Sequence, residues 1–222
     1  MYNNLINVLI VLLGWLVYSI LHSTLASTTV KAWFARRYPG LAHHYRLAYN
    51  LIAALALMPL IWLIHTYQGA PIWSLTGPGR WLVDGMALAA MAGFFWSLRF
   101  YDMREFLGLR PVASPGQERR FTLSPLHRHV RHPWYSFGLV VIWSRDMDTA
   151  WLASCIAISL YFALGSRLEE RKLAAEFGEA YRRYQERVPA LIPLPGRSLN
   201  RDEAEEIIES VNSYTSNSPG NF

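Results

Sequence analysis

The chain alternates between long apolar segments and short polar ones. The four longest apolar segments are residues 5–26, 47–64, 81–98 and 149–165. Each approaches the roughly 20 residues that an α-helix needs to cross a hydrocarbon core of about 30 Å. A fifth segment, Trp134–Trp143, covers only about 15 Å as a helix, so it needs Pro133 and the polar turn Ser144–Asp148 to reach across. The pattern predicts an all-α, polytopic membrane helix bundle of about five transmembrane helices, the last two forming a tight hairpin.

Composition agrees with a membrane bundle. The 222 residues are 52% hydrophobic and only 17% charged, which suits a single small membrane domain better than a soluble one. We assign residues 1–195 to this domain and 196–222 to a polar C-terminal tail. Residues 166–187 mix charges with apolar residues at helical spacing, which predicts an amphipathic helix that the following prolines end. A further acidic helix is expected at 201–211.

Basic residues are concentrated in the segments on one side of the predicted bundle. They lie in the loop 27–46, in the segment 99–133 and after residue 166, whereas the two opposite loops hold only Arg80 and Arg145. By the positive-inside rule, we expect the N-terminus outside and the C-terminus in the cytoplasm. The net charge of +5 then fits an anionic inner leaflet, and membrane lipids are expected partners rather than nucleic acid.

Residues 1–30 and the single cysteine, in the apolar segment 149–165, argue against a secretory signal and against disulfide or zinc sites. Residues 1–30 contain no Lys or Arg, so they are interpreted as the first membrane helix and not as a secretory signal. Cys155 is the single cysteine, which excludes a disulfide framework or a zinc site of paired cysteines.

Polar, titratable groups lie at the cytoplasmic ends of the two helices that form the predicted hairpin. Arg131, His132 and Pro133 precede its first arm, and Glu169 and Glu170 follow its second. Such groups beside the hydrocarbon indicate a functional site. Pro133 favours the first position of a helix, which makes His132 its N-cap and leaves backbone N–H groups that attract an anion. The two carboxylates suit hydroxyl, ammonium or sulfonium groups. Counting residues along the two arms predicts that the glutamates stand roughly 10 Å farther out than His132.

These residues resemble a known signature. The Arg-His-Pro-x-Tyr run from Arg131, with Phe137 where the family often has Gly and Gly138 next, is followed by the Glu-Glu pair and by Val188–Pro189. This order is similar to the C-terminal signature of the isoprenylcysteine carboxyl methyltransferase and phospholipid methyltransferase superfamily, integral membrane enzymes that use S-adenosylmethionine. The match covers about residues 125–195.

A second resemblance covers the N-terminal half. The pattern is similar to that of the bacterial branch that contains methanethiol S-methyltransferases and the NnrU membrane proteins, and it comprises His22–Ser23, Lys31, Tyr45–Arg46, Tyr49–Asn50, Asp102 and Phe106–Arg110. This resemblance implies a methyltransferase of the bacterial inner membrane and leaves the methyl acceptor open: a thiol, an isoprenylcysteine carboxylate or an amino-lipid.

The superfamily resemblance implies a cofactor site for S-adenosylmethionine. The residues it assigns to that site are Arg131, His132, Pro133, Tyr135, Gly138, Glu169 and Glu170. Among them, Arg131 and Pro133 shape the loop.

The acceptor side is interpreted from the residue types. Methyl transfer from a sulfonium chiefly requires a positioned, desolvated acceptor, and a thiol or amine also needs a base. The candidate bases are His22, Asp102 and Glu170. Arg104 and Arg110 are candidates to hold an anionic acceptor in a bidentate fork.

Several of these residues have simpler interpretations. Arg131 can meet lipid phosphates, His132 can serve only as a helix cap, and His22 can hydrogen-bond a neighbouring helix. One of the two glutamates can pair with Arg167, Arg171 or Lys172 on its own helix surface.

Two alternative functions remain at this stage. One is a non-catalytic, NnrU-like accessory protein with the same fold. The other is a membrane oxidase with a histidine box, suggested by His127, His129 and His132. The interleaved Arg128 and Arg131 would repel a metal cation, so no metal site is predicted.

Overall fold

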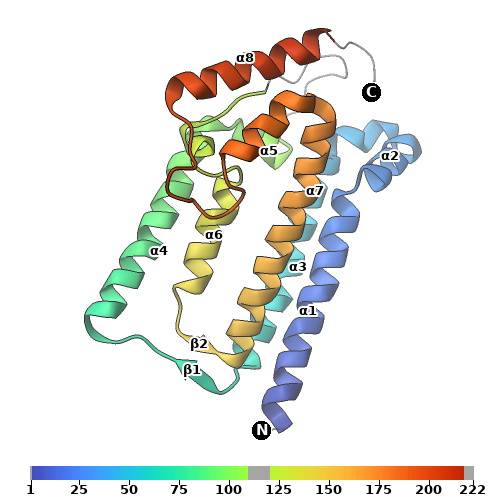
Figure 1. Ribbon diagram of the computed structural model, residues 1–222. Coiled ribbons are helices and arrows are strands. Elements are labelled where there is room, and N and C mark those ends of the chain that lie inside the picture. Colours follow the sequence, from blue (N-terminus) through green and yellow to red (C-terminus); the bar gives the residue numbers. More distant parts are fainter. Residues whose placement is uncertain (1, 110–120, 218–222) are drawn as a thin grey trace. The chain divides into compact units, whose positions relative to one another are not determined.

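The computed structural model of the protein describes residues 2–109 and 121–217, and these are almost entirely helical (Figure 1). The α-helices are α1 (Tyr2–Ala26), α2 (Thr28–Arg37), α3 (Tyr45–Thr66), α4 (Gly77–Ser97), α5 (Met103–Leu107), α6 (Pro133–Trp143), α7 (Thr149–Arg187) and α8 (Arg201–Asn217). Short 3₁₀ turns cover Pro39–His44, Leu98–Phe100 and Pro125–Arg128. Two short antiparallel strands are β1 (Pro71–Trp73) and β2 (Met147–Asp148). The all-α prediction is confirmed.

The long helices have the length and composition of membrane spans. Within the described residues, four stretches are long and apolar enough to cross a bilayer: Asn4–Ala26, Pro39–Thr66, Gly77–Phe100 and Thr149–Arg187. The apolar helix α6 has only 11 residues, as its short apolar run predicted. Large apolar side chains such as Leu55, Trp81 and Leu88 are more than 60% exposed, which a hydrocarbon environment favours. The protein is therefore an integral membrane protein.

Two compact units make up the chain. The first contains residues 1–85, 101–115 and 142–161, and the second contains residues 86–100, 116–141 and 162–222, in each case as far as the structure describes them. Helices α4, α6 and α7 each contribute residues to both units.

In the first unit, α1 packs closely on α3. The contact surrounds the buried Val11, Leu60 and Ile64, together with Ala150 from α7. Gly14 permits this approach, because a Cβ at that position would lie 2.9 Å from a methyl carbon of Leu60. A small residue at a helix crossing is a common device in membrane bundles.

Polar contacts hold the ends of this unit's helices. Asp148 caps α7, since its Oδ1 accepts hydrogen bonds from the backbone N–H groups of Ala150 at 2.8 Å and Trp151 at 2.9 Å. Arg80 donates to Asp84 at 2.7 Å and to Asp146 at 2.9 Å. Both contacts tie the irregular segments around β1 and β2 to the helices they connect.

In the second unit, α6 packs against the end of α4. The indole Nε1 of Trp134 donates to Ser97 Oγ at 2.7 Å, and this hydroxyl donates in turn to the Phe94 carbonyl at 2.6 Å. Gly93 makes room for the ring of Phe137, because a Cβ there would lie 2.8 Å from the ring. The apolar α6 is thus held by one buried polar link and by close ring packing.

Helix α7 continues well past its apolar part. The sequence predicted a separate amphipathic helix from residue 166, but the helix runs unbroken through 166–177 because this stretch contains neither Gly nor Pro. The break comes at Gly178, which has φ 62° and ψ −143°. Only glycine adopts such a conformation readily, so Gly178 sets where the chain turns into its last helical segment.

Gly178→Ala is expected to lower the free energy of unfolding by about 1–3 kcal/mol, because the added Cβ strains this backbone conformation. Chemical denaturation in detergent micelles measures the effect. Gly85→Ala is the matched control: Gly85 lies inside α4, with no atom within 4 Å of the added Cβ, and should not destabilise. Equal stability of Gly178→Ala and wild type would contradict the role of Gly178.

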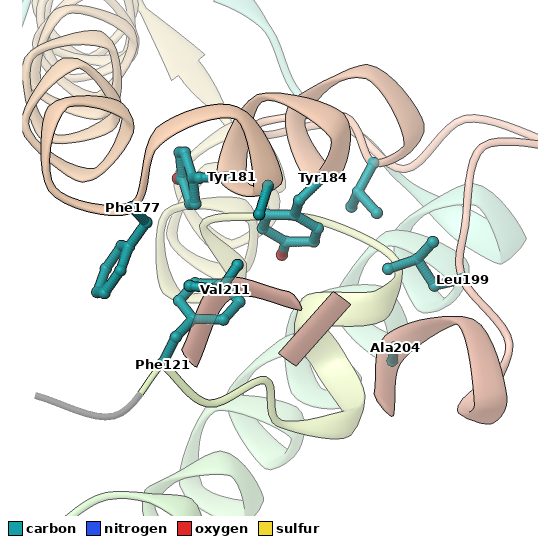
Figure 2. Close-up of a cluster of buried hydrophobic side chains, with 9 residues drawn as sticks. Phe121, Phe177, Tyr181, Tyr184, Leu199, Ala204 and Val211 are labelled. Carbon is teal, nitrogen blue, oxygen red and sulfur yellow. The ribbon is translucent and has the colours of Figure 1, made fainter. Parts of the chain in front are cut away.

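The segments on either side of this break build a second hydrophobic core. Figure 2 shows the rings of Phe121, Tyr181 and Tyr184 gathered within it. Helix α8 forms where the sequence predicted a helix, extends to Asn217, and buries Ala204 and Val211 in this core. The core members are Phe121, Phe177, Ala180, Tyr181, Tyr184, Val188, Leu199, Ala204 and Val211. The apolar side of the amphipathic helix predicted for 166–187 therefore contributes Phe177, Tyr181 and Tyr184 to the hydrophobic core of the second unit.

Candidate functional site

A buried ion pair joins the start of α6 to α7. Arg131 Nε lies 2.7 Å from Oε1 of Glu170, and Arg131 Nη2 lies 2.9 Å from Oε2, so the guanidinium meets the carboxylate in a bidentate fork. Both side chains are only 10% exposed. Arg131 is therefore not available to lipid phosphates, and Glu170 pairs with a distant residue rather than with a cation on its own helix.

Two further donors complete the environment of Glu170. His132 Nε2 lies 3.0 Å from Oε1, and Gln185 Nε2 donates to Oε2 at 3.1 Å. Gln185 was not identified from the sequence. It belongs to the last segment of α7, beyond Gly178, and no pattern in the chain places it opposite Glu170.

The backbone before α6 is fixed by the proline-containing segment that follows α7. The N–H groups of Arg131 and His132 donate to the carbonyls of Pro189 at 2.9 Å and Ala190 at 3.0 Å. Arg131 Nη1 also donates to the carbonyls of Gln185, at 2.8 Å, and Val188. This segment was predicted only to end a helix. Its backbone carbonyls also hold the Arg131–His132 dipeptide in place.

Helix α6 begins at Pro133, as predicted, and the Ser136 N–H donates to the carbonyl of His132 at 3.1 Å. The predicted 10 Å offset between His132 and the glutamates is wrong. The chain leaves the helix after Trp143, and extended residues rise about 3.3 Å each compared with about 1.5 Å in a helix. The first arm, which is α6 with residues 144–148, therefore spans as far as the longer stretch of α7 up to Glu170, although it has fewer residues.

Aromatic rings continue from His132 along this side of α6. The ring of Tyr135 is stacked on His132 at 5.5 Å and on Phe162 at 4.5 Å, with interplanar angles of 11° and 7°. Gly138 allows this, because a Cβ there would lie 3.2 Å from the Phe162 ring. Phe162 was missed from the sequence, although it stands seven residues before Glu169 and so shares its helix face.

Glu169 differs from its neighbour. Its side chain is 54% exposed, and its Oε2 lies 3.6 Å from Nδ1 of His132, which is too long for a hydrogen bond. The second unit thus contains all the residues that the superfamily resemblance assigned to a cofactor: Arg131, His132, Pro133, Tyr135, Gly138, Glu169 and Glu170.

The residues expected on the acceptor side have different surroundings. His22, Asp102 and Arg104 belong to the first unit, and Arg110 lies outside the described residues. Asp102 caps α5 by accepting from the N–H groups of Arg104 at 3.0 Å and Glu105 at 3.1 Å. The side chain of Arg104 is exposed.

His22 lies in a cluster of hydroxyl-bearing side chains within the first unit. The Tyr49 hydroxyl is 2.7 Å from its Nε2. Tyr18 stacks on its ring at 5.6 Å, and the ring of Tyr161 meets it edge-on at 6.0 Å. Ser23 Oγ lies 3.1 Å from the Tyr161 hydroxyl. Three helices, α1, α3 and α7, supply this cluster.

Two of the three histidines that suggested a metal box, His127 and His132, have other partners. His127 Nδ1 lies 2.7 Å from Ser124 Oγ, and His132 contacts Glu170. Within residues 2–109 and 121–217, no group of three or more His, Cys, Asp or Glu side chains is arranged to hold a metal ion.

Acid should destabilise the second unit through His127. Burial, with the nearby His132, lowers the pKa of His127 to about 4, below the value of about 6.5 in an unfolded chain. The unfolded state therefore binds more protons between these values, and stability falls as the pH drops from about 6.5 to 4, by up to about 3 kcal/mol. Denaturation at pH 7 and pH 4 tests this, with His127→Gln expected to lose much less stability on acidification. An equal loss in both proteins would exclude His127 as the cause.

Comparison with known proteins identifies the family. The chain is 34% identical over 195 residues to a methanethiol S-methyltransferase of Mycobacterium tuberculosis, covering 85% of this chain and 78% of that protein. It is 32% identical over 192 residues to methanethiol S-methyltransferase 2 of Bradyrhizobium diazoefficiens, covering 84% and 73%. The chain belongs to the methanethiol S-methyltransferase family.

A further relative carries the same name, whereas the comparisons with family models and solved structures found no match. A methanethiol S-methyltransferase of Crocosphaera subtropica is 29% identical over 206 residues, covering 87% of this chain and 78% of that protein. No protein-family model matches the chain, and no solved structure matches it. The chain is a member of the methanethiol S-methyltransferase family, and the part of it that the structure describes has four apolar helices long enough to cross a bilayer, so the protein is a membrane methyltransferase.

Proposed function

We propose that this membrane methyltransferase transfers the methyl group of S-adenosylmethionine to a small thiol such as methanethiol. The observation that carries the proposal is the arrangement around His132 in a chain of this family. A fixed imidazole, an exposed carboxylate at Glu169 and a stacked aromatic pair, Tyr135 and Phe162, lie together in one unit. The relatives are named for methanethiol, which supports the choice of acceptor.

These side chains fit S-adenosylmethionine chemically. The cofactor carries an aromatic base, two ribose hydroxyls, an ammonium group and a carboxylate, and it supplies an activated methyl group on a sulfonium. Acceptor atoms on His132 and Glu169 match the hydroxyl and ammonium donors, and aromatic rings suit a planar base. Arg131 holds the loop, as its contacts within the second unit favour, and the buried Pro133 begins α6.

A thiol acceptor requires deprotonation before it attacks the methyl carbon. His22 is our candidate base, because Asp102 caps α5 and Glu170 accepts from Arg131, His132 and Gln185. In the transfer a base would take the thiol proton, the sulfur would form the new bond to the methyl carbon, and the bond from that carbon to the sulfonium would break. The products would be a thioether and S-adenosylhomocysteine, with the proton released to water.

Orientation is part of the same proposal. The basic residues concentrated in the loop 27–46, the segment 99–133 and beyond residue 166 support an N-terminus outside and a C-terminus in the cytoplasm of a bacterial inner membrane. The Arg131–Glu170 pair would then face the compartment that supplies S-adenosylmethionine.

Calorimetric titration of the purified protein with S-adenosylhomocysteine tests the cofactor assignment. Wild type should bind one equivalent. His132→Ala should weaken binding by roughly 10-fold or more, because it removes both a ring contact and a polar atom. Absence of binding to wild type would overturn the proposal and favour an accessory protein that has the fold without the chemistry.

A further inference from the structure

The adjacent residues Glu169 and Glu170 differ in how many hydrogen bonds their carboxylates accept. A carboxylate has about four positions at which it accepts hydrogen bonds. In Glu170 all four are used, by Nε and Nη2 of Arg131, by Nε2 of His132 and by Nε2 of Gln185. A ligand could gain a bond to Glu170 only by displacing one of these donors. Glu170 therefore serves the protein's own structure.

This bonding also fixes the tautomer of His132. A carboxylate oxygen only accepts, so the 3.0 Å contact with Glu170 requires the hydrogen on Nε2 of the ring. In the neutral imidazole, Nδ1 is then an acceptor. It points toward Glu169, whose Oε2 is 3.6 Å away. In this neutral form of His132, two acceptor atoms face one position without bonding each other.

Glu169 is available at that position. It is 54% exposed, and its carboxylate has no hydrogen-bonding partner in the part of the chain that the structure describes. Two neighbouring acceptors that lack a donor between them suit a group that brings several N–H or O–H hydrogens, such as an ammonium or a pair of vicinal hydroxyls.

We propose that Glu169 and Nδ1 of His132 contact the donor groups of the cofactor, whereas Glu170 and Gln185 are positioning residues that set the tautomer of His132. This assignment rests on the proposed function for the identity of the ligand. It divides a pair that the sequence treated as equivalent, and it adds Gln185 to the residues on which binding depends.

Gln185 reaches Glu170 because the chain reverses at Gly178. The two residues are 15 positions apart, which would place them about 22 Å apart in a continuous helix. The break brings the last segment of α7 back, so that the Gln185 side chain donates to Glu170 while its carbonyl accepts from Arg131. Changes at Gln185 should therefore reach the ligand only through His132.

The experiment compares Glu169→Gln, Glu170→Gln and Gln185→Leu with wild type in calorimetric titrations with S-adenosylhomocysteine. Thermal unfolding is measured in parallel. Glu169→Gln should weaken binding roughly 10- to 100-fold and leave the unfolding midpoint unchanged, because it removes an exposed charge that only the ligand uses. Glu170→Gln should lower the midpoint as well as the affinity. Glu179→Gln, an exposed change on the same helix, is the control and should match wild type in both.

Nitrogen NMR of ¹⁵N-histidine-labelled protein tests the positioning role directly. In wild type, His132 should show the signature of a hydrogen on Nε2. That signature should be lost or mixed in Glu170→Gln and Gln185→Leu, and retained in Glu169→Gln. A purely structural role for Glu170 would change stability and leave the tautomer of His132 unaltered, which would contradict the proposal.

A truncated ligand identifies the donor. 5′-Methylthioadenosine keeps the ribose hydroxyls and lacks the amino-acid part. If the loss of affinity in Glu169→Gln persists with this ligand, the hydroxyls are the donors, and if it is confined to S-adenosylhomocysteine, the ammonium is. Unchanged affinity of Glu169→Gln for S-adenosylhomocysteine would overturn the assignment, whereas failure of wild type to bind would overturn the proposed function itself.

Discussion

Arg131→Ala is expected to lower the free energy of unfolding by about 3–5 kcal/mol, the largest stability effect of any single substitution considered for this protein. The variant leaves the Glu170 carboxylate in a site where the side chain is only 10% exposed, with its bidentate partner removed. It also removes the donors that Arg131 gives to the carbonyls of Gln185 and Val188. The end of α7 and the segment after it would lose these side-chain attachments to the start of α6, whereas the backbone hydrogen bonds to Pro189 and Ala190 would remain.

Chemical denaturation in detergent micelles measures this loss. Arg182→Ala is the matched control, because Arg182 is 64% exposed and its contact with Glu179 is 4.0 Å long, so its removal should cost less than about 1 kcal/mol. The double variant Arg131→Met with Glu170→Leu should recover part of the stability, since it leaves no unpaired buried charge. If the double variant lost as much free energy of unfolding as Arg131→Met and Glu170→Leu lose together when measured singly, this explanation would be contradicted.

His22→Ala is expected to reduce the rate of methyl transfer to a thiol by roughly 100- to 10,000-fold, the contribution typical of a general base. Binding of S-adenosylhomocysteine should remain unchanged, because His22 is not among the residues assigned to the cofactor. Tyr49→Phe should reduce the rate to a smaller extent, since it removes the hydroxyl that lies 2.7 Å from Nε2 of His22.

Steady-state kinetics with methanethiol, monitored by release of the thioether, measures both variants. His65→Ala is the control, because this exposed histidine near the end of α3 should have no influence on the reaction. If His22→Ala keeps the wild-type rate, or loses rate only in proportion to folded protein, then His22 is a packing residue that holds α1 against α3.

Much of the fold can be predicted from the sequence, because the length of each run of apolar residues can be read directly along the chain. The four long spans, the short α6 and its start at Pro133 are set by runs of apolar residues and by one proline. The Arg80–Asp84 contact joins residues one helical turn apart, so the helix itself brings them together.

The site was less accessible to sequence analysis, because its contacts join distant positions. Arg131 and Glu170 are 39 residues apart, and their pairing depends on how far each arm of the hairpin rises. The arms were counted as uniform helices, and the non-helical residues 144–148 invalidated that count. Gln185 enters the site only because the chain reverses at Gly178, a backbone conformation that the presence of a glycine permits without predicting.

Transfer of a labelled methyl group tests the proposed function most directly. Purified protein in lipid nanodiscs is supplied with S-adenosylmethionine labelled in its methyl group and, separately, with methanethiol, an isoprenylcysteine and an amino-lipid. Our proposal predicts labelled dimethyl sulfide from methanethiol, with little or no label in the other two acceptors, and loss of this product in His22→Ala. Label transferred to the isoprenylcysteine or the amino-lipid but not to methanethiol, or to none of the three, would contradict it.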